Sequence, residues 1–144
     1  MIATPSRLGS AIAFAFASIV LMFANVSPAR ADLNGVMLQY FHWNLPDDGL
    51  HWNQLADESE ALFQAGFSAV WLPPATKGAF GASDVGYAPY DHYDLGEFDQ
   101  RGSVRTKYGT KKQYLRAIKA AHRAGLYVIA DVVMNHVGGA DETE

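Results

Sequence analysis

Three short apolar segments, separated by two segments with helical spacing, constrain the fold of this chain most. The apolar segments span residues 35–41, 67–72 and 126–134, and the helical patterns lie at 52–63 and 110–125. Strands that are apolar almost throughout are typical of parallel sheets that are covered on both faces. The sequence therefore predicts an α/β fold. Three strands alone leave a doubly wound sheet and a barrel both open.

The second helical segment carries start and stop signals. Thr110 and Gln113 fit a capping box at its beginning, and Gly125 occupies the C-terminal cap position, as Gly66 does after the first helical segment. One face is marked by Leu115, Ile118, Ala121 and His122, and the opposite face by Lys112, Arg116, Lys119 and Arg123. We expect the basic stripe to be a solvated surface.

The first 31 residues are typical of a secretory signal peptide. Arg7 precedes an apolar stretch at 11–24 that only Ser18 interrupts, and an Ala-Arg-Ala sequence ends at Ala31. The alternative is a membrane anchor, but this stretch is shorter than the roughly 20 residues that a membrane-spanning helix needs. We expect cleavage after Ala31, a secreted protein and no membrane attachment after cleavage.

Composition excludes several classes of function. The 144 residues include 11 Lys and Arg against 15 Asp and Glu, a net charge of −4, which argues against a nucleic-acid partner. The absence of cysteine excludes a disulfide, a thiolate zinc site and a cysteine nucleophile. No Gly-x-Gly-x-x-Gly or P-loop motif follows a predicted strand. The chain is also shorter than the roughly 250 residues of a complete (β/α)₈ barrel.

Three polar residues gather at the end of the third predicted strand. Asp131 lies inside this apolar strand, where an ionised carboxylate is costly unless it is paired. Asn135 points the same way in an extended chain, and His136 is next to it. The carboxyl ends of strands carry the ligands in α/β folds, so these residues suggest a polar site. A buried structural network is the alternative, and Asn135 suits either a loop hydrogen bond or one oxygen ligand of Ca²⁺.

Residues 75–109 form a long irregular segment that is rich in aromatic side chains. Such loops are functional or disordered, and the aromatic content argues against disorder. Tyr87, Tyr90 and Tyr93 recur every third residue, with Asp and His between them. Aromatic faces with interleaved carboxylates suit sugar rings, and a locally packed apolar loop explains the same pattern equally well.

The segment Asp131-Val-Val-Met-Asn-His136 resembles the first signature region of the α-amylase family of glycoside hydrolases. Segment 39–43 is similar to the first strand of this family and the loop that follows it, and segment 69–74 is similar to the second strand. Segments 84–87, 93–98 and 106–110 are similar to its liquefying bacterial subgroup. The resemblance covers residues 35–144. It implies the N-terminal portion of a TIM (β/α)₈ barrel, with about three strands and two helices. Residues 32–137 would be part of catalytic domain A, and 138–144 the start of the inserted domain B.

The resemblance also implies roles for the residues noted above. Tyr87 would be the aromatic platform under the sugar at the cleavage subsite, and His136 would hydrogen-bond the same sugar. Asp131 would organise the strand end, and Asn135 would be one ligand of a structural Ca²⁺. The implied activity is endo-hydrolysis of α-1,4-glucosidic bonds in starch, glycogen and maltooligosaccharides by a secreted enzyme that is monomeric when complete.

The reaction implied by the resemblance is a retaining double displacement by two carboxylates roughly 5–5.5 Å apart. The family's three carboxylate motifs follow later strands and do not occur here, so we expect the nucleophile, the acid/base and the third carboxylate beyond Glu144. The chain by itself is expected to be inactive and not independently stable. The alternatives are a non-catalytic glycan-binding protein and a maltooligosaccharide-forming amylase of the same family.

Overall fold

The structure is a computed structural model that describes residues 35–139. The predicted signal peptide at 1–31 and most of the predicted start of domain B, residues 140–144, lie outside the described residues. Across 35–139, no helix is both long enough and apolar enough to cross a membrane.

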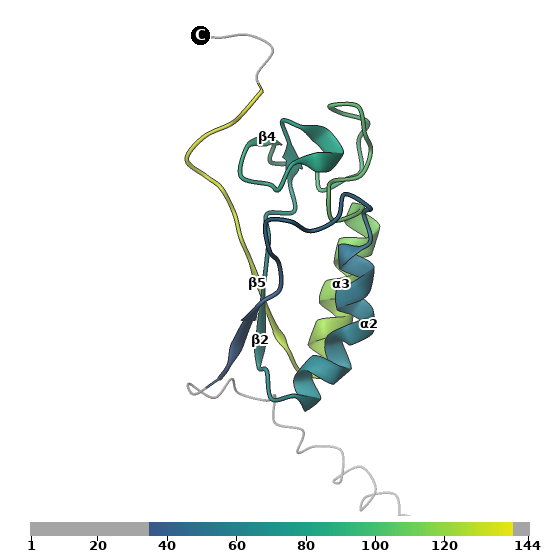
Figure 1. The fold of residues 1–144 in the computed structure, drawn as a ribbon, viewed down its shortest axis with the longest axis vertical. Coiled ribbons are helices and arrows are strands. Elements are labelled where there is room, and N and C mark those ends of the chain that lie inside the picture. The colour runs from purple at the N-terminus through teal and green to yellow at the C-terminus, as the bar shows by residue number, and fades with distance from the viewer. Residues whose placement is uncertain (1–34, 140–144) are drawn as a thin grey trace, which may run out of the picture. The chain divides into compact units, whose positions relative to one another are not determined.

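A three-stranded parallel sheet with two helices on one side forms the body of the described chain (Figure 1). In chain order these elements are β1 (Met37–Gln39), α2 (His51–Gln64), β2 (Ala69–Leu72), α3 (Lys111–Ala124) and β5 (Tyr127–Ala130). The strand order is β1-β2-β5, with β2 parallel to both neighbours. The predicted alternation of strand and helix is confirmed, and with it the α/β class.

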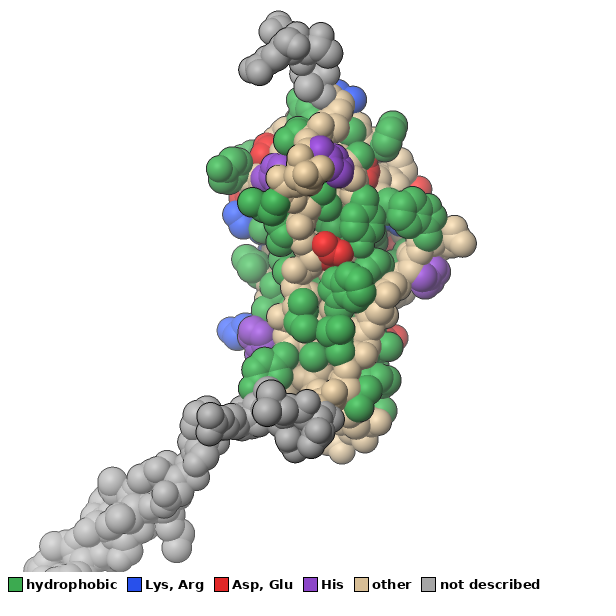
Figure 2. Space-filling view, turned by 90° about the vertical axis from the view of Figure 1, so that its left-hand side faces the viewer, with side chains coloured by type: hydrophobic (Ala, Val, Ile, Leu, Met, Phe, Trp, Pro, Cys, Tyr) green, Lys and Arg blue, Asp and Glu red, His purple; other side chains and the backbone are tan. Residues whose placement is uncertain are grey.

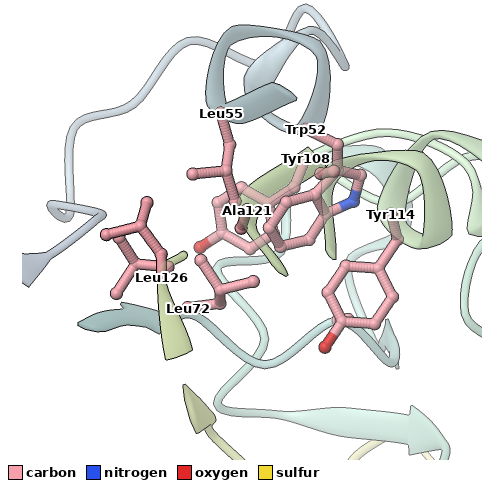
Figure 3. Packing of buried hydrophobic residues seen from close by; sticks show 10 residues of the cluster. Trp52, Leu55, Leu72, Tyr108, Tyr114, Ala121 and Leu126 are labelled. Carbon is pink, nitrogen blue, oxygen red and sulfur yellow. The ribbon is translucent and has the colours of Figure 1, made fainter. Parts of the chain in front are cut away.

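The hydrophobic core lies between the sheet and the two helices (Figure 3). Trp52 of α2 is fully buried, and its ring centroid lies 5.3 Å from that of Tyr108 and 4.8 Å from that of Tyr114. The aliphatic part of the core consists of Leu55, Val70, Leu72, Ala75, Ala117, Ala121 and Leu126. Because Tyr108 belongs to the segment before α3, the same core anchors that segment to the helices.

Helix α3 begins and ends as predicted, but its buried face matches the predicted one only in part, at Ala121 and Ile118. Gln113 N donates to Thr110 Oγ1, Thr110 N donates to Gln113 Oε1 at 2.7 Å, and Gly125 has a left-handed φ of +98°. The buried positions are Tyr114, Ala117 and Ala121, whereas Leu115 and His122 are exposed. The buried residues of α3 are set by its contacts with α2 as well as with the sheet. The apolar spacing within one helix does not show where a second helix will pack.

The basic stripe of α3 is exposed, as predicted. Arg116 also reaches α2, where it donates to Asn53 Oδ1 at 3.2 Å and to Asp57 Oδ1 at 2.9 Å. An ion pair this exposed contributes little to stability, so the stripe is mainly a solvated surface.

Within residues 35–139 the sheet is covered on one face only, and the cover expected for the second face does not come from these residues. Both helices lie on the same side of the sheet (Figure 1), and apolar side chains spread over the opposite side (Figure 2). Met37, Tyr127 and Ile129 are between 44% and 49% exposed, while Val70 is fully buried. Apolar composition on both faces of these strands therefore does not mean that both faces are covered within this part of the chain.

The segment between β2 and α3 is ordered by a buried charge pair. It contains two short antiparallel strands that the sequence did not predict, β3 (Lys77–Gly78) and β4 (Pro89–Asp91), and a short 3₁₀ turn, η1 (Gly81–Ser83). Lys77 Nζ lies 3.4 Å from Asp94 Oδ2, and both side chains are fully buried. These contacts give the segment a fixed shape, as its aromatic content predicted.

Candidate functional site

Asp131 lies at the carboxyl end of β5 and not inside the strand. The strand ends at Ala130, and Asp131 N makes one further ladder hydrogen bond to Leu72 O, at 3.1 Å. Its side chain is half-buried. The prediction of a carboxylate inside a buried strand is therefore wrong, because the apolar run at 126–134 continues beyond the sheet into irregular backbone.

Tyr87 meets Asp131 at this end of the sheet. The phenol of Tyr87 donates a hydrogen bond to Asp131 Oδ2 at 2.9 Å, across 44 positions of sequence. Burial, this hydrogen bond and the carboxylate's negative charge together raise the pKa of Tyr87 to about 12. The phenol therefore stays neutral at physiological pH and holds the Asp131 carboxylate in place.

The turn before Tyr87 is held by two buried side chains. Gly86 has a φ of +97°, a conformation that other residues rarely adopt. Asp84 Oδ1 accepts a hydrogen bond from Gly86 N at 2.7 Å, and Tyr108 Oη donates to Val85 O at 2.8 Å. Tyr108 therefore connects the position of Tyr87 to the hydrophobic core. Sequence analysis missed Tyr108 because its contact with Val85 spans 23 positions. The contact of Asp84 with Gly86 spans two positions, and an Asp two residues before a Gly was the available signal.

His136 joins the same group from the irregular segment after β5. Its Nε2 lies 2.9 Å from the backbone oxygen of Tyr87. A carbonyl oxygen can only accept, so Nε2 carries the hydrogen, and Nδ1 remains for another partner. The His136 side chain is exposed. The structure thus brings Tyr87, Asp131 and His136 together.

The other two tyrosines of the sequence pattern have different surroundings. The guanidinium carbon of Arg101 lies 5.0 Å from the centroid of the Tyr90 ring, within cation–π range. Tyr93 is 88% exposed. The spacing of three tyrosines therefore does not by itself identify a sugar-binding strip, and Tyr87 is the one that contacts Asp131.

Asn135 is exposed on the segment beyond β5. Ca²⁺ takes about six to eight oxygen ligands. Within residues 35–139 there is no group of three or more His, Cys, Asp or Glu side chains that would hold a metal ion. The donor chemistry of the Asn135 side chain fits a single oxygen ligand of such a site.

Trp43 is a site residue that sequence analysis did not identify. Its ring is parallel to that of Tyr87, with an interplanar angle of 1° and a centroid distance of 6.2 Å, and it is 68% exposed. Both rings line a hollow together with Phe80, Ser83 and Asp84. The available signal was a large aromatic residue just after the first predicted strand, where a parallel sheet places its ligands.

The fold and the site define an α/β protein with an aromatic and polar site at the carboxyl edge of a parallel sheet. The family described as "Alpha amylase, catalytic domain" matches residues 51–144. The chain belongs to the α-amylase family.

Relatives agree with this assignment. The chain is 55% identical over 141 residues to an α-amylase of Geobacillus stearothermophilus, covering 96% of this chain and 26% of the relative. It is 52% identical to a glucan 1,4-α-maltohexaosidase of Bacillus sp. strain 707, covering 88% and 24%. It is also 52% identical to a cytoplasmic α-amylase of Escherichia coli, covering 77% and 22%. The chain thus spans about a quarter of the length of these curated relatives.

A solved structure also matches the fold. An alternansucrase in complex with isomaltononaose superposes with a TM-score of 0.64 at 24% identity, covering 75% of this chain and 10% of that one. At this identity the likeness concerns the fold alone.

Proposed function

We propose that this chain forms the N-terminal part of an α-amylase that hydrolyses internal α-1,4 bonds of starch and glycogen. The observation that carries the proposal is the meeting of Tyr87, Asp131 and His136 at one edge of a parallel sheet. The rings of Tyr87 and Trp43 offer apolar faces for sugar rings, and Nδ1 of His136 is available for a sugar hydroxyl. Membership of the α-amylase family supports the same substrate class.

In this proposal the described residues bind and orient the glucan, and other segments carry out the bond cleavage. Asp131 is engaged with the Tyr87 phenol and is therefore assigned to holding the platform. The nucleophile and the acid/base of a retaining reaction are expected from segments outside the described residues, with their carboxyl groups roughly 5–5.5 Å apart.

The bare face of the sheet supports a barrel as the complete fold. In a (β/α)₈ barrel the strand faces turned away from the helices pack against one another in the interior. Met37 and Tyr127 pair with Ala69, and Ile129 pairs with Trp71. These positions alternate with Val70 and Leu72 of the core, so the three apolar side chains lie on the face opposite the helices. We therefore propose that further strands close a barrel over this face, with residues 32–137 in domain A and the inserted domain B beginning at 138.

Secretion and a monomeric state are further parts of the proposal. The pattern of residues 1–31 supports export, although one relative carries the name of a cytoplasmic enzyme. We expect an N-terminus at Asp32 in protein recovered outside the cell. N-terminal sequencing of that protein tests this, and recovery of an intact N-terminus from the cytoplasm contradicts it.

The full-length protein assayed on amylose tests the activity. The wild type is expected to release maltooligosaccharides. His136→Ala is expected to lower kcat/KM by about tenfold or more, the equivalent of about 1.5–3 kcal/mol if the imidazole is charged. His122→Ala, at an exposed histidine of α3, is the matched control and should retain wild-type kinetics.

Two alternatives predict different outcomes of this assay. A non-catalytic glycan-binding protein would bind amylose without turnover, through the same Tyr87 and His136. A maltooligosaccharide-forming amylase would release one dominant product length, and the name of the Bacillus sp. relative supports this alternative. The time course of product lengths separates it from random endo-hydrolysis.

A further inference from the structure

We propose that His92 is a positioning residue for the segment that carries Asn135 and His136. Its Nε2 lies 2.6 Å from the backbone oxygen of Val133, across 41 positions of sequence. Within the described residues, His92 is not hydrogen-bonded to Asp131 and does not line the hollow beside Tyr87. Its contact is with the backbone of Val133, so we infer that it acts on the site through that backbone. The inference rests on the proposed function, in which His136 binds the glucan.

The backbone around His92 is held firmly. Asp91 Oδ1 accepts a hydrogen bond from Tyr93 N at 2.8 Å, and Asp91 Oδ2 accepts one from Gln100 Nε2 at 2.8 Å. Asp94, two residues after His92, lies in the buried ion pair with Lys77. His92 therefore projects from a rigid part of the loop between two anchored aspartates.

The segment that His92 contacts has few other supports. Residues 131–139 form no helix or strand, and Val132, Met134 and Val137 are between 56% and 80% exposed. Gly138 N donates to Pro89 O at 2.6 Å near the far end. Between Asp131 and His136, His92 supplies a side-chain contact to the backbone of this segment. On either side of Val133 the segment is held by the contacts of Asp131 and His136 with Tyr87. Without His92, the Val133 peptide loses its contact with the loop, and the position of His136 then depends on Tyr87 alone.

The contact needs a hydrogen-bond donor more than a ring. Val133 O can only accept, so Nε2 of His92 must carry the hydrogen. The amide nitrogen of glutamine reaches a similar distance from the backbone and also donates. Leucine has comparable bulk and no donor. His92→Gln should therefore preserve the position of the segment, and His92→Leu should lose it.

A double-mutant cycle in the full-length enzyme tests the inference. The assay measures kcat and KM on a maltooligosaccharide with a chromogenic leaving group for His92→Leu, His92→Gln, His136→Ala and the double variant of His92→Leu with His136→Ala. We expect His92→Leu to lower kcat/KM roughly three- to tenfold, mainly through kcat, and His92→Gln to stay within about twofold of wild type. His122→Leu is the matched control.

The cycle separates positioning from general destabilisation. If His92 acts by placing His136, then His92→Leu has little further effect once His136 is alanine. Additive losses, wild-type kinetics in His92→Leu, or equal losses in the Leu and Gln variants would each overturn the inference. A wild type that binds amylose without hydrolysis, or a silent His136→Ala, overturns the proposed role of His136 and this inference with it.

Discussion

At the scale of single residues, the site depends on a neutral phenol placed beside a carboxylate. Tyr87 donates to Asp131, and its raised pKa of about 12 means that the folded state resists loss of the phenol proton. In the unfolded chain a tyrosine ionises near its ordinary pKa of about 10. The contribution of this group to stability is therefore complete below about pH 10 and is lost as the pH rises toward 12.

Substitution of Tyr87 by phenylalanine tests this linkage. We expect the stability difference between wild type and Tyr87→Phe to be constant below about pH 10 and to shrink between about pH 10 and 12, because phenylalanine does not ionise. Urea unfolding of the full-length protein at a series of pH values measures it. A difference that stays unchanged up to pH 12 would show that the phenol proton is not held by the fold.

Asn135 tests the proposed calcium ligand. We expect Asn135→Ala in the full-length protein to reduce the rise in melting temperature that added Ca²⁺ produces, because a metal that binds only the folded state stabilises it by mass action. Melting curves of both proteins over a calcium titration measure this. Equal calcium-dependent shifts in the two proteins would exclude Asn135 as a ligand.

At the scale of elements, the segment between β2 and α3 is the part that the site depends on. Asp94 Oδ1 accepts hydrogen bonds from Gly96 N and Glu97 N, both at 2.8 Å, while Oδ2 has no hydrogen-bond partner and is compensated by Lys77 at 3.4 Å. Lys77 Nζ also donates to Val104 O at 2.8 Å. One buried ammonium thus joins both halves of the segment that carries Tyr87 and His92.

Lys77→Met is expected to destabilise the protein strongly. It leaves the Asp94 carboxylate buried without its cation, and breaking a buried pair in this way costs about 3–5 kcal/mol. The double variant of Lys77→Met with Asp94→Asn should lose less than the sum of the two single variants. Chemical unfolding of the full-length proteins provides the comparison, and strict additivity would contradict a direct interaction between the two charges.

The elements also show where local sequence signals suffice. The capping box of Thr110 and Gln113 and the left-handed Gly125 were predictable because each involves residues within one helical turn. Of the face predicted for α3, Ala121 is buried and Ile118 packs against the core, whereas Leu115 and His122 are exposed. Tyr114 and Ala117 are buried in their place. That face is set by the approach of α2, which no periodicity within α3 encodes.

At the scale of the whole molecule, the described chain has an uncovered apolar sheet face and two unpaired sheet edges. Within residues 35–139, β1 and β5 each pair with β2 alone. Exposed apolar surface of this kind and free strand edges favour association. This part of the chain is therefore expected to depend on further structure for its stability.

Expression of residues 32–144 alone tests that dependence. We expect a product that aggregates or binds a hydrophobic dye, unfolds without a sharp transition and does not hydrolyse starch. Analytical ultracentrifugation, thermal unfolding and a starch assay measure these properties. A soluble monomer with a cooperative transition would contradict the expected instability, and starch hydrolysis would contradict the absence of catalytic carboxylates.

The sequence alone determined the order of the three parallel strands and two helices, the ends of α3 and the candidates Tyr87, Asp131, Asn135 and His136. Periodicity, capping chemistry and motif resemblance are all properties of short stretches of chain. Tertiary structure decided which face of the sheet stays bare, that Tyr87 meets Asp131, that Trp43 lies parallel to Tyr87, and that His92 contacts Val133. These contacts join residues some forty positions apart. Their energies depend on the distance and orientation of atoms that only the folded chain brings together.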